Sequence, residues 1–335
     1  MSYLEYRVNS APKGFSKILH MNWAIVILLL GITVIGCVML YSVGGAFSTW
    51  AEPQAKRFLL AFSMMFIMAM IPIWFWRKVS FFAYCFTLIL IVSVSLFGSK
   101  GMGAQRWIDI GFMKLQPSEL VKLSLVMALA AYYDMLPEKK VSQPLWVLFP
   151  LFLIILPAFL VLRQPDLGTA LLILLTGATV MFLAGVHWGY FATVSTTAVV
   201  TVIIIFQSRD TAWQLLKNYQ YRRIDTFLDP ASDPLGAGYH ITQSKIALGS
   251  GGLLGRGLTH GTQSQLNFLP EKHTDFIFTT LAEELGFVGA ISLLIMYMLV
   301  LVFCLISALE AKDRFSSLLI SGFAMTFFSF FAVNM

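Results

Sequence analysis

The segment LPEKHTDFIF, residues 269–278, gathers Glu271, Lys272, His273 and Asp275 directly before a long apolar run. A carboxylate such as Asp275 can act as a general base, which accepts a proton from a substrate hydroxyl. Asp275 also stands where the N-cap of the following helix is expected, and there it would satisfy a free backbone N–H. The spacing alone leaves both interpretations of Asp275 open.

His273 and Glu271 are candidates to orient the Asp275 carboxylate or to bind a metal ion. A His and an Asp two positions apart are weak evidence for a metal site, and the other four histidines are scattered along the chain. We therefore predict no metal site and place His273 and Glu271 at the rim of the candidate site.

Glu119 and Lys122 form a second candidate pair, three residues apart and just after Pro117. Proline favours the first turn of a helix, and side chains at this spacing share one helix face. Charges within a membrane are costly and are usually paired. The pair is therefore either a local ion pair that fixes the helix or part of a functional cavity.

Three further carboxylates lie at or within apolar runs. Asp166 precedes LGTALLILL, so it is expected to cap a helix, and a role beside Arg163 at a cavity rim is the alternative. Glu283 and Glu284 lie inside an apolar run, where we expect one of them to face the protein interior and find a partner.

A glycine-rich segment, GSGGLLGRG at residues 249–257, matches neither GxxxxGK[ST] nor GxGxxG and follows no expected strand. A nucleotide site is therefore not predicted. Flexible turns near a substrate groove are the expected role of these glycines.

The composition indicates the elements that must position these residues. Of 335 residues, 58% are hydrophobic and only 12% are charged, and the mean hydropathy is +0.78. Since a helix needs about 20 apolar residues to cross a membrane, we predict an all-α, multi-pass membrane helix bundle. Nine spans are expected, near residues 23–43, 57–76, 80–97, 118–135, 144–163, 167–186, 188–206, 276–309 and 314–335.

Basic residues give the expected orientation. The N-terminal segment carries Arg7, Lys13 and Lys17 without a cleavage site after the first apolar run, so that run is expected to be a retained span. The loops on the N-terminal side hold nine Lys and Arg against six in the short loops opposite. This predicts a cytoplasmic N-terminus and places residues 98–117 and the long connection 207–275 on the outer face.

The long connection is predicted to hold an amphipathic helix near residues 210–230, which lies along the membrane surface. A short helix that ends in glycines is predicted over residues 240–257. The net charge of +6 comes without any dense Lys or Arg run, so no nucleic-acid partner is predicted. The three cysteines, Cys37, Cys85 and Cys304, fall in different predicted spans and indicate no disulfide framework.

Four segments in this order resemble the SEDS (shape, elongation, division and sporulation) family: QRWIDIGFMKLQPSELVKL, RQPDLGTA, GAGYHITQSKIALGSGGLLGRG and QLNFLPEKHTDFIFTTLAEELGFVG. The resemblance covers nearly the whole chain and is closest to the branch that serves cell elongation and rod shape. Family members have ten spans, with a Gly- and Pro-rich outer loop before the last one. Because this chain stops at FFAVNM, we expect residues 1–335 to form a single SEDS domain without that loop and span.

The resemblance implies a peptidoglycan glycosyltransferase that polymerises lipid II on the outer face of the inner, cytoplasmic membrane. It makes Asp275 the essential catalytic residue and Glu119 with Lys122 a required pair in a central cavity, near Arg106 and Trp107. It also implies a class B penicillin-binding protein, a transpeptidase, as partner, together with other membrane proteins of the elongation machinery.

The mechanism we expect uses Asp275 as the base that activates a sugar hydroxyl, while a lipid pyrophosphate leaves. The departing negative charge needs a cation, for which Arg106, Lys122, Lys245, Arg222 or a divalent metal ion are the candidates. Two rival functions are a flippase for lipid-linked precursors and a non-catalytic scaffold for the transpeptidase. A flippase predicts ionisable groups near the bilayer midplane, whereas a scaffold would tolerate loss of Asp275.

Overall fold

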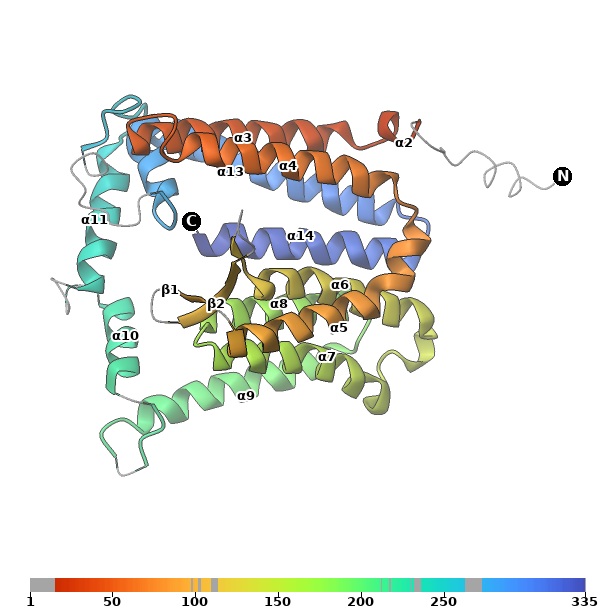
Figure 1. The fold of residues 1–335 in the computed structure, drawn as a ribbon. Helices are drawn as coiled ribbons and strands as arrows, with labels where there is room; N and C mark the ends of the chain where they lie inside the picture. The colour runs from red at the N-terminus through yellow and green to blue at the C-terminus, as the bar shows by residue number, and fades with distance from the viewer. Residues whose placement is uncertain are drawn as a thin grey trace. The chain divides into compact units, whose positions relative to one another are not determined.

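Long helices make up most of the chain (Figure 1). The structure is a computed structural model, which describes residues 16–97, 99–101, 104–109, 114–211, 213–216, 218–229, 231, 236–262 and 273–334. The chain divides into two compact units. The first unit comprises residues 1–25, 62–188 and 301–332, and the second comprises 26–61, 189–300 and 333–335.

A long helix lies in each of the nine apolar windows. These helices are α3 (Trp23–Gly44), α4 (Ala51–Met70), α5 (Ile73–Phe97), α6 (Pro117–Met135), α7 (Pro144–Arg163), α8 (Leu167–Leu183), α9 (Trp188–Gln207), α13 (Ile277–Leu309) and α14 (Arg314–Asn334). Among the described residues, six helices are long and apolar enough to cross a membrane, namely α3, α5, α7, α9, α13 and α14. The prediction of a multi-pass helical membrane protein is therefore confirmed, while nine spans stay a prediction.

The helix boundary near the second and third windows was predicted wrongly. The expected spans 57–76 and 80–97 are replaced by α4, which ends at Met70, and α5, which begins at Ile73. Proline has no N–H to donate and disfavours helical geometry in the residue before it. Pro72 therefore separates the two helices several residues earlier than the apolar pattern indicated.

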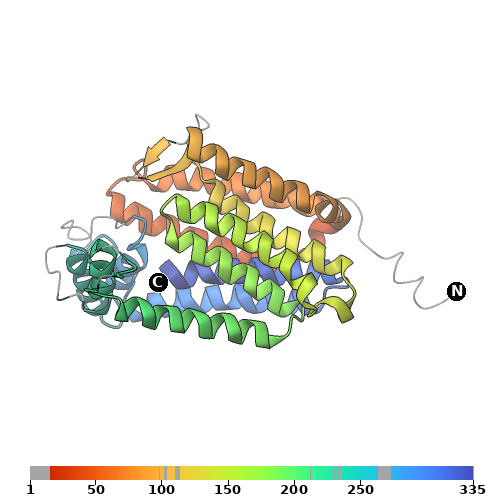
Figure 2. The same cartoon turned by 90° about the horizontal axis from the view of Figure 1, so that it is seen from below.

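The first unit is built around α6, whose Val121, Leu125 and Leu129 are fully buried. Its helices α5, α7 and α8 run beside α6 with closely aligned axes (Figure 2). Helix α14 approaches α6 closely because Gly322 has no side chain: a Cβ there would lie 2.5 Å from Val126.

The second unit buries Met39 of α3 against Leu281 and Leu293 of α13. Helix α9 has no buried residue although its composition is apolar enough to cross a membrane, as expected for a helix that faces lipid. The Tyr221 hydroxyl lies 2.8 Å from the Ser208 hydroxyl and ties the end of α9 to α10.

A small antiparallel sheet follows α5, and the all-α prediction did not include it. Its strands are β1 (Ser99–Gly101), β2 (Ala104–Asp109) and β3 (Lys114–Leu115), in the order β1-β2-β3. The strands pair in register at Lys100 with Gln105 and at Ile108 with Leu115. This sheet carries Arg106 and Trp107.

The remaining elements are short. They are α2 (Ser16–Leu19), the 3₁₀ turn Glu138–Lys140, α10 (Asn218–Leu228) and α11 (Ala237–Ser250). The helix expected from residue 210 begins only at Asn218, because the chain turns after Ser208. Helix α11 ends at Ser250, inside the glycine-rich segment, and Gly251 caps it, so the expected short helix that ends in glycines is confirmed.

Candidate active site

Asp275 lies in the turn 273–276, which leads directly into α13. Its side chain is exposed, and no other described residue forms a hydrogen bond or ion pair with its carboxylate. Helix α13 begins at Ile277, and within the described chain its first turn donates no hydrogen bond to that carboxylate. The N-cap interpretation of Asp275 therefore finds no support, and the carboxylate is open to a ligand.

His273 stacks on Trp50, with ring centroids 4.1 Å apart and planes inclined by 17°. Trp50 belongs to the turn that precedes α4. A stacked aromatic pair of this kind restricts both side chains. The contact therefore fixes the start of the turn that carries Asp275. Sequence reasoning missed Trp50, because nothing local to LPEKHTDFIF points to it.

Both Glu283 and Glu284 are buried, with 0% and 1% of their surface exposed. The Ser42 hydroxyl of α3 lies 2.7 Å from each carboxylate oxygen of Glu284, and it also accepts the Thr259 N–H at 3.0 Å. The Thr262 hydroxyl donates to Glu283 at 3.1 Å. We expected one of these glutamates to face the interior and find a partner; both are buried and both have partners.

Helix α13 is broken at Gly286, where φ is 69° and ψ is −168°. The break exposes backbone groups that normally bond within the helix. The glycine-rich segment satisfies them through four backbone hydrogen bonds: Arg256 N–H to Glu283 O (3.1 Å), Gly257 N–H to Glu284 O (3.0 Å), Phe287 N–H to Gly252 O (2.9 Å) and Val288 N–H to Leu253 O (3.1 Å).

Glycine is required where this segment meets α13. A Cβ on Gly251 would lie 2.1 Å from the Ala282 carbonyl oxygen, and one on Gly255 would lie 2.1 Å from that of Glu284. Gly255 also has a φ of +79°, which other residues rarely adopt. The expectation of flexible turns is thus corrected: the segment is held against the helix that follows Asp275.

In the first unit, Glu119 and Lys122 meet as predicted, with Nζ 2.9 Å from Oε1. The Lys122 side chain is 1% exposed, and its ammonium lies 3.6 Å from the centre of the Phe330 ring. Glu119 is 41% exposed. The cation is therefore held by one carboxylate and one aromatic face, while the carboxylate remains accessible.

Arg106 joins β2 to the turn between α7 and α8. Its Nε donates to the Gln164 carbonyl at 3.2 Å, a second nitrogen donates to the Pro165 carbonyl, and Nη1 lies 3.7 Å from Asp166. Asp166 in turn accepts the Thr169 N–H at 3.2 Å, so the predicted helix cap is confirmed.

The alternative role of Asp166, beside Arg163, is not supported, since no ion pair joins these two described residues. The Arg163 guanidinium lies over the Phe159 ring at 4.8 Å, and Arg106 is the basic partner of Asp166. Trp107 follows Arg106 in β2 and pairs with Ser99 across the ladder.

The two remaining cationic candidates, Arg222 of α10 and Lys245 of α11, are both exposed. Nearby in sequence, Arg209 donates to both oxygens of Asp225 at 2.8 and 2.7 Å. These hydrogen bonds hold the pKa of the Asp225 carboxyl below its usual value. Glu271 lies outside the described residues, and within those residues no three His, Cys, Asp or Glu side chains form a metal-binding group.

The predicted site residues thus divide between the two units. Asp275, His273, Lys245 and Arg222 belong to the second unit, and Glu119, Lys122, Arg106 and Trp107 belong to the first. Within the second unit, Trp50 and Ser42 support the turn and the helix beside Asp275, and sequence reasoning identified neither. The signal for Ser42 was weak, a lone hydroxyl near the end of an apolar span.

Comparison with known proteins adds to this geometry. A family model named FTSW_RODA_SPOVE, described as "Cell cycle protein", matches residues 20–335. The chain is 38% identical to the peptidoglycan glycosyltransferase MrdB of Escherichia coli K12, over 97% of this chain and 86% of that protein. It is 35% identical to the probable peptidoglycan glycosyltransferase FtsW of Buchnera aphidicola, over 88% of this chain and 75% of that protein.

Two solved structures share the fold. One chain comes from a peptidoglycan synthase complex that coordinates polymerization and crosslinking, with a TM-score of 0.76, 28% identity and coverage of 93% of this chain and 85% of that one. The other is a mutant of the rod shape determining protein RodA of Thermus thermophilus, with a TM-score of 0.66 and 25% identity over 93% of this chain and 84% of that one.

Proposed function

Because this chain belongs to the FtsW/RodA/SpoVE family, we propose that it is a peptidoglycan glycosyltransferase. It polymerises lipid II into glycan strands for cell elongation and rod shape. Two relatives that align over 97% and 88% of this chain are named as peptidoglycan glycosyltransferases, the second as a probable one, and these names support the proposal. Its substrate, the undecaprenyl-pyrophosphate-linked disaccharide pentapeptide, carries its own leaving group, so the reaction needs no nucleotide.

We propose Asp275 as the general base of this reaction. The observation that carries the assignment is an exposed carboxylate, without a partner among the described residues, on a turn next to a tightly held helix. Asp275 removes the proton from the 4-hydroxyl of the acceptor N-acetylglucosamine as that oxygen attacks the anomeric carbon of the donor N-acetylmuramic acid. The bond to the pyrophosphate oxygen breaks, undecaprenyl pyrophosphate leaves, and one displacement inverts the α-linkage to β.

The leaving pyrophosphate requires positive charge as its bond breaks. Lys245 and Arg222 are exposed and available to a phosphate. Lys122 is bound to Glu119, and Arg106 is bound to carbonyls and Asp166. We therefore assign direct phosphate contact to Lys245 and Arg222 first, and a supporting role to Arg106, Trp107, Glu119 and Lys122. A divalent cation would supply the same charge stabilisation when bound.

The proposal also covers the membrane in which the protein resides and its orientation there. The chain is a multi-pass protein, and we assign it to the inner membrane with a cytoplasmic N-terminus and the connection 207–275 outside. Residues 1–335 act as one SEDS domain. The proposed partners are a class B penicillin-binding protein, which crosslinks the new glycan, and other membrane proteins of the elongation machinery. A neighbour of the same fold comes from a synthase complex, which favours this arrangement.

The experiment supplies lipid II to the purified chain with its transpeptidase partner and measures glycan polymer. Wild type is expected to produce polymer, and Asp275→Ala to produce none above background. Lys245→Gln is expected to retain reduced activity, because other cations share the charge. If Asp275→Ala yields as much polymer as wild type, the assignment of Asp275 as the catalytic base is wrong. That result would favour a non-catalytic scaffold for the transpeptidase.

A further inference from the structure

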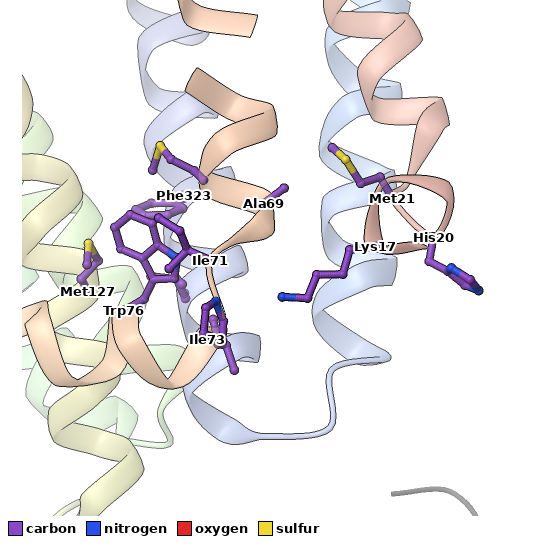
Figure 3. A pocket seen from close by; sticks show the side chains of 12 residues that line it. Lys17, His20, Met21, Ala69, Ile71, Ile73, Trp76, Met127 and Phe323 are labelled. Atoms are coloured by element: carbon purple, nitrogen blue, oxygen red, sulfur yellow. The ribbon is translucent and has the colours of Figure 1, made fainter. Parts of the chain in front are cut away.

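An apolar groove of about 650 Å³ opens in the first unit, where α2, α4, α5, α6 and α14 meet. Its walls include Met68, Ile73, Trp76, Met127 and Phe323, with Lys17 at one end. Figure 3 shows the Lys17 side chain extended from α2 toward the turn at Ile73. Apart from the basic residues Lys17 and His20, the lining is almost entirely hydrocarbon and aromatic. We call this hollow the Lys17 groove.

The Lys17 ammonium has no acidic partner among the described residues. It donates one hydrogen bond, to the Met70 carbonyl at 2.9 Å. An ammonium carries three donors, so two have no partner among the described residues and are available to a ligand. Arg77 of α5, in contrast, pairs with Asp134 and Asp313 at 3.2 and 3.4 Å.

The groove therefore combines a cation at its rim with an apolar interior. Trp76 lines it and Trp74 lies in the same turn of α5. Aromatic residues of this kind concentrate at the level of lipid headgroups. A lysine at a helix end keeps its ammonium at that level while its stem lies along apolar surface. The matching ligand has a negative headgroup and an acyl chain.

We propose that the Lys17 groove is a binding site for an anionic phospholipid. The phosphate accepts hydrogen bonds from the Lys17 ammonium, and one acyl chain lies along Met68, Trp76 and Phe323. A volume of about 650 Å³ falls within the usual size of ligand pockets. The charge selects anionic lipids over zwitterionic ones, because only the former leave an uncompensated negative charge at Lys17.

Native mass spectrometry of the detergent-purified chain tests this site. Phosphatidylglycerol and phosphatidylethanolamine with identical acyl chains serve as probes. Wild type is expected to retain phosphatidylglycerol preferentially, and Lys17→Gln to bind it about fivefold more weakly, the effect of losing one lysine near a lipid surface. Lys78→Gln is the matched control, since it removes one positive charge from α5 but does not line the groove.

A second variant tests the apolar part. Ala69 lines the groove, so Ala69→Trp fills it without changing charge and is expected to weaken phosphatidylglycerol binding. Glycerol phosphate without acyl chains is expected not to compete. Thermal unfolding verifies that each variant is folded. Equal binding by wild type and Lys17→Gln, an equal loss in Lys78→Gln, or unchanged binding by Ala69→Trp would each overturn the proposed site.

Discussion

Individual carboxylates in the second unit have contrasting environments. Glu283 and Glu284 are buried and bonded to hydroxyls, whereas Asp275 is exposed and free of described partners. A buried carboxylate without donors is very costly, so the hydroxyls hold the first two in place. A carboxylate without protein donors keeps its lone pairs for a substrate, which is what general-base work requires.

Ser42→Ala tests the partner of Glu284. The substitution removes the hydroxyl that contacts both oxygens of a buried carboxylate, so we expect a loss of about 1–3 kcal/mol in unfolding free energy. Thermal unfolding of the purified chain measures it. Ser292→Ala is the matched control, because Ser292 is exposed and bonds only within α13 among the described residues, and it should change stability by less than about 0.5 kcal/mol. Equal effects of the two variants would refute the role of Ser42.

Glu119→Ala tests the pair in the first unit. It leaves the buried Lys122 ammonium with the Phe330 ring but no carboxylate. Because Glu119 is partly exposed, we expect a loss of about 1–3 kcal/mol, below the range for a fully buried pair. The double variant Glu119→Ala with Lys122→Met should recover most of that loss in a thermal-unfolding cycle. Additive losses would show that the two residues do not interact.

Among the elements, α13 is unusual because a break at Gly286 opens it to a second segment. The glycine-rich segment fills the open backbone positions, and its glycines permit an approach that no Cβ would allow. The helix that follows Asp275 is therefore stabilised by a segment that precedes it in the chain. We infer that this docking keeps the Asp275 turn in one position.

Gly255→Ala is expected to disturb this docking. It places a methyl group against the Glu284 carbonyl oxygen and strains a positive φ, at a cost of about 2–3 kcal/mol or more. Glycan synthesis should fall together with thermal stability. Gly249→Ala is the control, because a Cβ there meets nothing within 4 Å. Wild-type stability in Gly255→Ala would contradict the docking.

Local features of the fold could be predicted from the sequence, and distant contacts could not. Apolar length predicted the long helices, and spacing within one turn predicted the Glu119–Lys122 pair. The Ser42–Glu284 and Trp50–His273 contacts join residues more than 200 positions apart, and no local pattern encodes them. The strands β1–β3 have two to six residues, too few for a recognisable alternation.

At the scale of the whole molecule, the candidate residues are distributed over two units that together include nine long helices among the described residues. The proposed function requires the connection between α9 and α13 to face outward, where lipid II is polymerised. Helix α9 supports a membrane setting, because it is long and apolar and none of its residues is buried.

Cysteine labelling tests this orientation. Lys245→Cys on α11 and Lys139→Cys in the turn before α7 introduce thiols at exposed positions. We expect a membrane-impermeant maleimide to label the first in spheroplasts and the second only after the membrane is opened. Labelling of the unsubstituted chain gives the background signal from Cys37, Cys85 and Cys304. Labelling of Lys139→Cys in intact spheroplasts would contradict the proposed orientation.

The rate of lipid II polymerisation by Asp275→Asn tests the central claim most directly. Asparagine keeps the size and capping ability of aspartate but cannot accept the proton. We predict unchanged thermal stability and a rate at least about 100-fold lower than that of wild type. A rate within a few-fold of wild type would contradict the assignment of Asp275 as the catalytic base.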